Sequence, residues 1–204
     1  MATSAIGTFD FEGQALNLFN ADENHISPVT LLTRKAFERW TEQGLHLNPA
    51  RQTEEVTKNY LLNRSYVLQN SKDETVGTFS ITDGTLENRP SQGFLLKRDS
   101  NEVPYQIDSP ELLETSVSKW LVFRKLAVAQ EYEKKGIAKW LYLNAEKECL
   151  RDTSYSGMML ETVKEARWLF EWYLSLGFKT IGSHRYPGVE IDTVLMIKER
   201  KYIV

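Results

Sequence analysis

The sequence predicts an α/β fold in which a mixed central β-sheet is flanked by helices. In the second half of the chain, apolar segments of strand length alternate with segments of helical periodicity, and such strand, helix, strand units normally join parallel strands. In the first half, residues 65–82 read as two strand patterns joined by a short polar turn, which predicts an antiparallel hairpin. The 204 residues, 41% of them hydrophobic, suffice for one substantial core, so we expect one domain over residues 1–204.

The N-terminal elements follow from local patterns. Residues 15–21 alternate apolar and polar side chains and predict a first strand. A helix is expected next, with Ser27 as its N-cap, Pro28 at its first position and Gly44 as its end. Its apolar side chains are expected on one face: Leu31, Leu32, Ala36, Phe37 and Trp40. A second, shorter helix is expected from Thr53, with its own apolar positions at helical spacing: Val56, Tyr60 and Leu61.

Residues 83–115 are rich in turn-forming residues and carry no long periodicity, so we expect a loop or hairpin insertion there. Within it, residues 109–115 predict a single capped helical turn. Segments of this length in a compact domain are often functional, which makes the insertion a candidate wall of a substrate site.

The remaining elements alternate regularly. Strands are expected at 116–128, 157–163, 178–184 and 190–199, and helices at 135–150 and 164–176. The final strand is apolar enough to pair at a sheet edge, which is compatible with a homodimer, although the sequence does not determine the oligomeric state.

Composition and charge argue against several function classes. The net charge is −3 with a pI near 5.7, and the basic residues are scattered, so nucleic acid is not the expected partner. Cys149 is a single cysteine, for which we expect a packed, unreactive thiol, and the three histidines are widely spaced, so no metal is expected. No window is apolar for long enough to span a bilayer and no leader pattern is present, so we expect a cytoplasmic protein with no membrane partner.

An anion site is predicted where the strand ending at Val128 gives way to the next helix. The first N–H groups of a helix lack intrahelical partners and lie at the positive end of its dipole. Gly136 has no Cβ and Ala138 is small, so a bulky ligand can approach the backbone there. Three lysines add positive charge: Lys134, Lys135 and Lys139. These residues fit a diphosphate as ligand, but by themselves they favour an ordinary solvated turn.

This stretch resembles the phosphate-binding loop of the GNAT superfamily, the acyl-coenzyme A dependent N-acetyltransferases. In that family, a strand ending in a Leu-Ala-Val-like triplet precedes Gln or Arg, two variable residues, Gly, one variable residue, and Gly or Ala. Here residues 126–128 are LAV and residues 133–138 are EKKGIA. The order of elements resembles the family from about residue 15 to residue 203, which implies the GNAT fold, a single N-acetyltransferase domain and acetyl-CoA as co-substrate. The resemblance also implies these coenzyme-binding positions: Leu126, Ala127, Val128, Glu133, Lys134, Lys135, Gly136, Ile137, Ala138 and Lys139.

Glu133 departs from the family pattern, which has Gln or Arg at that position. A carboxylate close to a diphosphate is repelled by an energy on the order of 1 kcal/mol or more. We expect Glu133 to turn outward and to pair with a neighbouring lysine, while the backbone N–H groups of residues 134–139 supply most of the interaction. The other interpretation is that coenzyme binding is weak.

A second landmark lies in residues 164–178, whose wide apolar stripe ends at Gly177 and predicts a core helix. By this pattern alone, Tyr173 is a packing residue. The GNAT family has a Tyr four residues before a Gly-Phe pair, which Tyr173, Gly177 and Phe178 match. The resemblance implies Tyr173 as the catalytic acid that protonates the departing thiolate. Ala166 and Leu169 replace the family's Asn and Ala at two further coenzyme-binding positions, so we expect a side-chain hydrogen bond to the pantetheine arm to be missing.

The resemblance thus implies an N-acetyltransferase that moves an acetyl group from acetyl-CoA directly to a primary amine, carried by a small molecule or by a peptide or protein. The alternative is a non-catalytic coenzyme-binding or interaction module on the same fold, and a nucleic-acid-linked amine is a lesser option. The acceptor side is expected to be flanked by residues 28–64, by the insertion and by the turn at 184–190. Candidate side chains there are Tyr105, Trp120, His184, Asp108, Glu111 and Glu114. Glu161 and Asp108 are conceivable general bases, but their spacing selects neither.

Overall fold

The computed structural model describes residues 4–89, 93–98, 101–108, 117–186 and 191–203. The chain forms two compact units, the first built from Met1–Ile81 and Arg124–Ala145 and the second from Thr82–Phe123 and Glu146–Val204. Three elements continue from one unit into the other: β4 (Thr75–Arg89), β7 (Val117–Val128) and α3 (Ile137–Arg151). A single domain over residues 1–204 with an insertion at 83–115 therefore stays a prediction. The helical turn expected at 109–115 lies outside the described residues.

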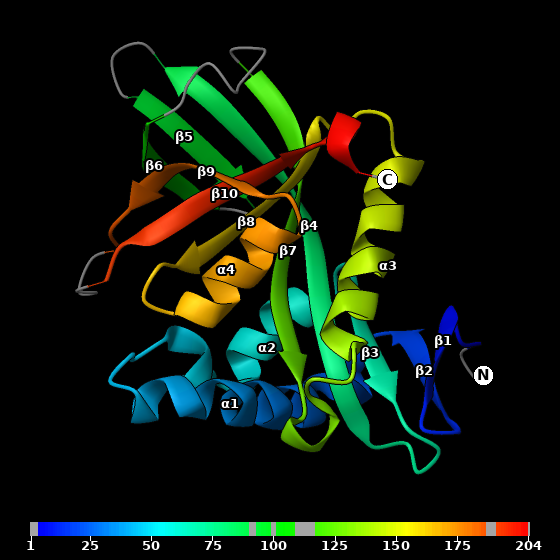
Figure 1. The fold of residues 1–204 in the computed structure, drawn as a ribbon. Coiled ribbons are helices and arrows are strands. Elements are labelled where there is room, and N and C mark those ends of the chain that lie inside the picture. The colour runs from blue at the N-terminus through cyan, green and yellow to red at the C-terminus, as the bar shows by residue number, and fades with distance from the viewer. Residues whose placement is uncertain (1–3, 90–92, 99–100, 109–116, 187–190, 204) are drawn as a thin grey trace. The chain divides into compact units, whose positions relative to one another are not determined.

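Antiparallel strands organise the first unit (Figure 1). They pair in the order β1 (Gly7–Phe11), β2 (Gln14–Asn20), β3 (Ser65–Gln69) and the first part of β4. The predicted first strand and hairpin are confirmed by β2, β3 and β4. The sequence does not predict β1, because its five residues alternate between exposed and half-buried and form no apolar stripe. A two-residue turn joins β1 to β2, and both of its residues, Glu12 and Gly13, have the positive φ that such a turn requires.

Two helices of this unit, α1 (Ile26–Glu42) and α2 (Glu54–Leu61), pack against each other. α1 begins earlier than predicted, because Asp22 caps the short 3-10 turn Glu23–His25 that leads directly into it. Ser27 and Pro28 lie inside the first turn of α1, so their predicted cap positions are wrong. Thr53 caps α2 as predicted, accepting a hydrogen bond of 3.2 Å from the Val56 N–H.

The buried faces of these helices differ in part from the predicted stripes. Leu31 is 54% exposed and Val56 is 45% exposed, so their predicted burial is wrong, whereas Leu32, Trp40, Tyr60 and Leu61 are buried. α1 buries Thr30 instead, whose hydroxyl lies 2.6 Å from that of Thr57. Because hydrogen bonding compensates the burial of a hydroxyl, the helix pair can pack at positions that the hydrophobic pattern assigns to the surface.

Seven strands form a closed ring in the second unit (Figure 1). In ring order they are the second part of β4, then β5 (Gly93–Arg98), β6 (Asn101–Ile107), β9 (Lys179–His184), β10 (Thr193–Glu199), β8 (Gly157–Val163) and the first part of β7, which pairs with β4. β7 and β8 run parallel, with Leu121 opposite Met158, whereas the registered pairs from β4 to β8 around the ring are antiparallel. The sheet is therefore mixed, as predicted, and α4 (Arg167–Ser175) packs against β8.

The segment predicted as an insertion contributes strands to this ring. β5 and β6 form a hairpin, and Gln106 and Ile107 of β6 pair with Ser183 and Gly182 of β9. A hairpin is thus confirmed, and a loop is excluded for the described part of the insertion. The final strand, β10, lies between β9 and β8 and is paired on both sides. Its predicted place at a sheet edge is wrong, and the homodimer expectation loses the observation on which it rested.

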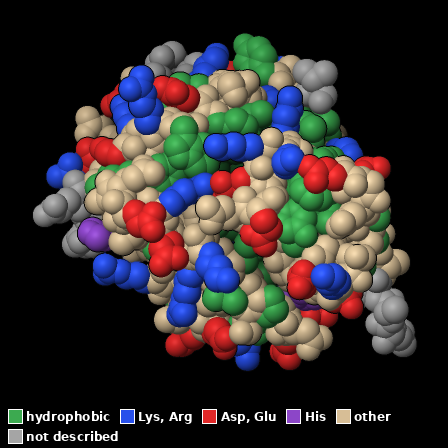
Figure 2. Space-filling model, turned by 60° about the horizontal axis from the view of Figure 1, so that its bottom comes forward, with side chains coloured by type: hydrophobic (Ala, Val, Ile, Leu, Met, Phe, Trp, Pro, Cys, Tyr) green, Lys and Arg blue, Asp and Glu red, His purple; other side chains and the backbone are tan. Residues whose placement is uncertain are grey.

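The interior of the ring is filled by apolar side chains. Its buried core consists of Leu86, Leu96, Val103, Tyr105, Trp120, Val122, Met159, Ile181, Leu195 and Ile197. At the surface, the face in Figure 2 shows basic and acidic side chains interspersed, with neither sign forming a continuous patch. No helix within the described ranges is long and apolar enough to cross a membrane.

Candidate functional site

The turn between β7 and α3 has an unusual backbone. It comprises the short 3-10 segment Gln130–Tyr132, then residues 133–136, after which α3 begins at Ile137. Lys134 has φ +58° and Gly136 has φ +86°, both in the left-handed region. For a lysine this conformation costs on the order of 1 kcal/mol. Left-handed residues alternating with other conformations turn successive N–H groups toward one point, an arrangement that suits anions.

The N–H groups at the end of this turn have no hydrogen-bond acceptor within the described ranges. Trp140 donates to the Gly136 carbonyl oxygen at 2.9 Å, which is the first backbone bond of α3 to reach back into the turn. Among the described residues, none accepts a hydrogen bond from the backbone N–H groups of residues 134–138. A Cβ atom placed on Gly136 would meet no atom within 4 Å, so space in front of the turn is open. The positive end of the α3 dipole therefore faces a vacant region that an anion can occupy.

Glu133 pairs with an arginine rather than with a neighbouring lysine. Arg39 of α1 donates from Nη1 to both carboxylate oxygens of Glu133, at 2.7 Å and 2.8 Å. The prediction of an outward-turned, paired Glu133 gave the wrong partner. Lys135 pairs instead with Glu12 of the β1–β2 turn at 2.5 Å, and Lys134 and Lys139 are exposed.

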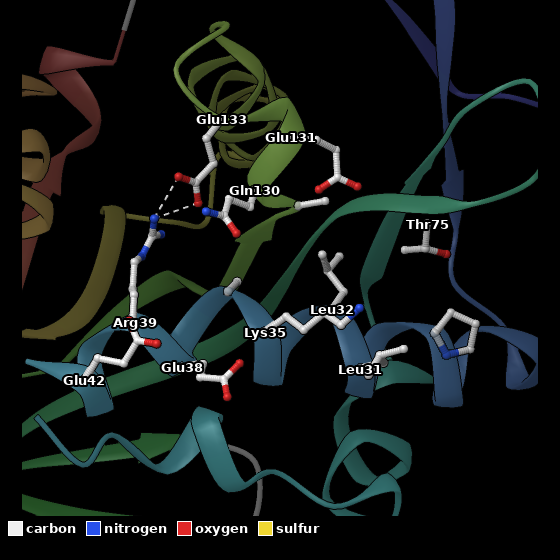
Figure 3. A pocket seen from close by; sticks show the side chains of 13 residues that line it. Leu31, Leu32, Lys35, Glu38, Arg39, Glu42, Thr75, Gln130, Glu131 and Glu133 are labelled. Atoms are coloured by element: carbon white, nitrogen blue, oxygen red, sulfur yellow. Dashed lines mark hydrogen bonds and ion pairs between the residues drawn. The ribbon is translucent and has the colours of Figure 1, made fainter.

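A pocket of about 650 Å³ adjoins this turn on the side of α1 (Figure 3). Its walls are one face of α1, which includes the exposed Leu31, and residues 129–131 and 133. Figure 3 shows Arg39 rising from α1 toward Glu133 at one end of this pocket. The pocket thus extends from the face of α1 to Glu133, the residue directly before the N–H groups that lack a described acceptor.

The Leu-Ala-Val triplet, residues 126–128, ends β7 and directly follows a residue with a left-handed backbone conformation. Lys125, one residue before the triplet, has φ +58°. Its Nζ donates to the Gln52 side-chain oxygen at 3.0 Å and lies 5.0 Å from the centre of the Tyr60 ring. These contacts hold Lys125 in a conformation that a lysine rarely adopts. In the triplet itself, residues 127 and 128 are buried and residue 126 is half-buried.

The second landmark lies in the second unit. Tyr173 of α4 is buried, with its ring 5.1 Å from that of Trp172 and edge-on to Phe178 at 6.0 Å. Burial raises the pKa of the Tyr173 phenol above its usual value of about 10. Ala166 is buried at the N-cap of α4 without a side-chain cap bond, and Leu169 is half-buried. Trp168, which belongs to the apolar stripe of residues 164–178, is 49% exposed, so the burial expected of that stripe is wrong at this position.

A buried polar cluster in the same unit is centred on Glu161 of β8. Its carboxylate accepts hydrogen bonds from Arg98 of β5, from Tyr105 of β6 and, at 2.7 Å, from Tyr186. Burial by itself raises the pKa of Glu161, but the charge of Arg98 and the hydrogen bonds from both tyrosines outweigh it, so the net pKa lies below the usual range. A carboxylate that is already engaged by three donors is a poor general base. Tyr105 and Glu161 were each candidates from the sequence, for separate roles. No sequence pattern indicates that both contact each other and Arg98 in the fold.

The structure distributes the predicted site residues between the two units. Residues 126–128 and 133–139 belong to the first unit, and Tyr173, Ala166 and Leu169 belong to the second. Of the acceptor candidates, Tyr105 and His184 lie with ring centres 5.6 Å apart, Trp120 is buried in the ring core, and Glu111 and Glu114 fall outside the described residues. In the part of the chain that the structure describes, no group of three or more His, Cys, Asp or Glu residues could hold a metal ion. Cys149 is fully buried, and burial raises the pKa of its thiol to about 11.

Comparison with known proteins identifies the fold. The sequence matches no protein-family model and no curated protein. Among solved structures, a GNAT-family acetyltransferase from Listeria monocytogenes is similar at a TM-score of 0.61 and 14% identity, over 95% of this chain and 99% of that one. Two Arabidopsis thaliana structures are similar at 14% identity: NAA60 in complex with acetyl-CoA (TM-score 0.58, 91% and 99% covered) and Naa50 in complex with the bisubstrate analogue CoA-Ac-MVNAL (TM-score 0.56, 90% and 98% covered). The chain therefore has the fold of the GNAT-family acetyltransferases.

Proposed function

We propose that this protein transfers an acetyl group from acetyl-CoA to a primary amine by direct attack of the amine on the thioester. The observation that carries the proposal is the turn before α3, whose N–H groups at residues 134–138 have no acceptor among the described residues and face open space. A diphosphate matches this turn in charge and in its number of hydrogen-bond acceptors. The likeness in fold to a protein solved with acetyl-CoA supports the same choice of ligand.

In this proposal, backbone groups make most of the contacts to acetyl-CoA. The N–H groups that open α3 receive the diphosphate, and Gly136 leaves them accessible because it has no side chain. The N–H and C=O groups of Leu126 and Val128 are assigned to the pantetheine arm and to the oxygen that becomes negative as the amine attacks. Ala127, Ile137, Ala138 and Lys139 complete the proposed coenzyme surface.

Tyr173 is proposed as the acid that protonates the departing thiolate. A thiol of this kind has a pKa of about 8.5, so a phenol that keeps its proton at neutral pH can share it with the leaving sulfur. Burial raises the Tyr173 pKa further, so the phenol keeps its proton at neutral pH and can donate a hydrogen bond to the leaving sulfur, while full transfer of the proton becomes less favourable. The missing polar side chain at Ala166 leaves the pantetheine arm to the backbone.

We propose an amino group of a small molecule or of a peptide or protein as the acceptor. The solved structure with this fold that holds a peptide-bearing bisubstrate analogue supports the second possibility. A non-catalytic coenzyme-binding module is the alternative, favoured by the carboxylate of Glu133 and the apolar Ala166 at two positions that are usually polar in the family.

Calorimetry with acetyl-CoA tests the proposal. Gly136→Glu should abolish binding, because its side chain would place bulk and negative charge in front of the open N–H groups. Gly44→Glu is a matched control: Gly44 also has a left-handed φ and open surroundings, but it lies at the end of α1. Unchanged affinity in Gly136→Glu would contradict the assignment.

An assay of thiol release over a panel of amines and peptides separates the enzyme from the alternative. Turnover of at least one acceptor, with loss of turnover in Gly136→Glu, is the expected result. Tight binding of acetyl-CoA without turnover on any acceptor, in protein with intact Tyr173, would favour the non-catalytic module.

A further inference from the structure

We infer that Gln52 is a positioning residue: its buried side chain holds Lys125 in a left-handed conformation and so sets the direction of the backbone groups at residues 126–128. The inference rests on the proposed function, which assigns those backbone groups to the pantetheine arm of acetyl-CoA. It adds a residue from the segment between α1 and α2, far from the loop motif in the chain. Neither Gln52 nor Lys125 belongs to the positions that the family resemblance implies.

Lys125 differs from the other residues that have a left-handed backbone. Among the described residues other than glycine, Glu12, Asp73 and Lys134 also have a positive φ, and all three lie outside helices and strands. Lys125, with φ +58°, lies inside β7, one residue before the triplet. A left-handed residue in a strand interrupts the alternation of the peptide groups, as at a β-bulge, and redirects the groups that follow. The conformation of Lys125 therefore determines how residues 126–128 present their N–H and C=O groups.

This conformation needs compensation, because a lysine has a Cβ atom. In the left-handed region the Cβ atom crowds the carbonyl oxygen, so residues other than glycine rarely adopt it. Lys125 Nζ donates to Gln52 Oε1 at 3.0 Å and lies 5.0 Å from the centre of the Tyr60 ring, within the range of a cation–π attraction. These contacts offset the cost of the left-handed backbone.

Gln52 is itself held by hydrogen bonds from several elements, and it is only 4% exposed. Because a lysine ammonium group can only donate hydrogen bonds, the amide oxygen of Gln52 must face Lys125. The amide nitrogen donates to the hydroxyl groups of Thr57 at 2.8 Å and Tyr60 at 2.9 Å. The backbone carbonyl oxygen of Gln52 accepts from Arg34 Nε of α1 at 2.5 Å. A buried amide with these bonds has one orientation, so Lys125 meets an acceptor at a fixed place.

A competing interpretation is that the contact only fastens the segment between α1 and α2 to β7. The two interpretations differ in what a glycine at position 125 does. Glycine adopts a positive φ about as readily as a negative one, so it needs no side-chain contact to hold the left-handed conformation. If Gln52 acts through the backbone of residue 125, glycine there should recover the binding that alanine loses. If the contact is only a fastener, both substitutions remove it equally.

The experiment is calorimetry on the full chain with acetyl-CoA and with adenosine 3′-phosphate 5′-diphosphate, which keeps a diphosphate but lacks the pantetheine arm. Lys125→Ala should weaken binding of acetyl-CoA by about five- to thirtyfold, the factor that corresponds to the cost of a left-handed residue. It should bind the fragment within about twofold of wild type. Lys125→Gly removes the same charge and the same contacts, but should bind acetyl-CoA within about threefold of wild type.

The role of Gln52 is tested in two backgrounds. Gln52→Met has a similar volume but no oxygen for Lys125, so it should weaken binding of acetyl-CoA about as much as Lys125→Ala. In the Lys125→Gly background, the same change should alter the affinity by less than about twofold, because glycine does not depend on the contact. Gln52→Glu, whose carboxylate can still accept from Lys125, should bind within about threefold of wild type.

Three results would overturn the inference: wild-type affinity of Lys125→Ala for acetyl-CoA, equal losses in Lys125→Ala and Lys125→Gly, or equal losses from Gln52→Met in both backgrounds. Equal weakening of acetyl-CoA and of the fragment in Lys125→Ala would also overturn it, because a general disturbance of the fold gives that pattern. The comparison at position 125 decides the question even if thermal melting shows that Gln52→Met does not fold. If wild type binds neither ligand, the proposed function itself fails, whereas binding that is insensitive to residue 125 removes only this inference.

Discussion

Gly84 of β4 lies so close to Val122 of β7 that a Cβ atom on the glycine would be 2.4 Å from the valine Cγ2 atom. Non-bonded carbon atoms do not approach to this distance without displacing one another. Val122 is fully buried in the core of the seven-stranded ring, so it has little room to move. At this contact the pairing of β4 with β7 depends on the absence of a side chain.

We therefore expect Gly84→Ala to reduce the free energy of unfolding by about 1–3 kcal/mol, as overpacking of a core does. Urea denaturation followed by circular dichroism measures the change. In the double variant Gly84→Ala/Val122→Ala the loss of unfolding free energy should be smaller than the sum of the two single losses, because the shorter side chain removes the clashing atom. A loss equal to that sum or larger would show that the contact is not the cause.

Arg98→Met should destabilise the protein by about 3–5 kcal/mol, because it leaves the Glu161 carboxylate buried without its countercharge. The side chains of Arg98 and Glu161 are only 16% and 14% exposed, so water cannot replace the lost partner. Arg167→Met is a matched control from an exposed pair with Glu171, and thermal melting should register little change there. Equal melting temperatures for the two variants would refute a stabilising role of the Glu161 cluster.

The lowered pKa of Glu161 predicts a dependence of stability on acid. Because the pKa is lower in the folded protein than in the unfolded chain, the unfolded chain binds the proton first as pH falls. The stabilisation is fully present above the unfolded value of about 4.5 and is lost as pH falls through the folded value. Glu161→Gln has no carboxylate to titrate, so its unfolding free energy should fall less steeply than that of wild type below about pH 5. If the unfolding free energies of the two proteins change with pH in parallel, Glu161 is not the source of the acid dependence.

Tyr173→Phe should lower kcat about tenfold or more with little change in KM, because the phenol is assigned to the departure of the thiolate and not to binding. Tyr202→Phe, at an exposed tyrosine of the same unit, serves as the control and should keep wild-type kinetics. Turnover of Tyr173→Phe at the wild-type rate would remove the acid role.

The sequence predicts most of the fold because most elements carry local periodicity. β8 is found at its predicted bounds, and α3 and α4 lie within a few residues of theirs. Closure of the ring could not be predicted, because pairing of Gln106 with Ser183 joins distant segments and leaves no local pattern. The start of α1 was misplaced for a different reason: two good capping signals compete, and Asp22 prevails over Ser27.

In the candidate site, too, features encoded by neighbouring residues could be predicted, whereas contacts between distant segments could not. The turn at residues 133–138 is visible in the sequence through its glycine, its lysines and the strand before it. The partner of Glu133 could not be predicted from the sequence. A carboxylate at an unexpected position indicates only that some cation is near, and Arg39 lies far away in the chain. The cluster around Glu161 was missed likewise, since its members come from three separate strands and a connecting segment.

Pairing of β6 with β9 has a consequence for synthesis of the chain on the ribosome. β4, β5 and β6 emerge early, but the strand that completes them at Gln106 and Ile107 is made much later. Until then, the outer side of β6 presents free N–H and C=O groups, which any extended polypeptide nearby can pair with. A nascent chain stalled between β6 and β9 is therefore expected to aggregate, or to recruit a chaperone, more readily than the completed chain.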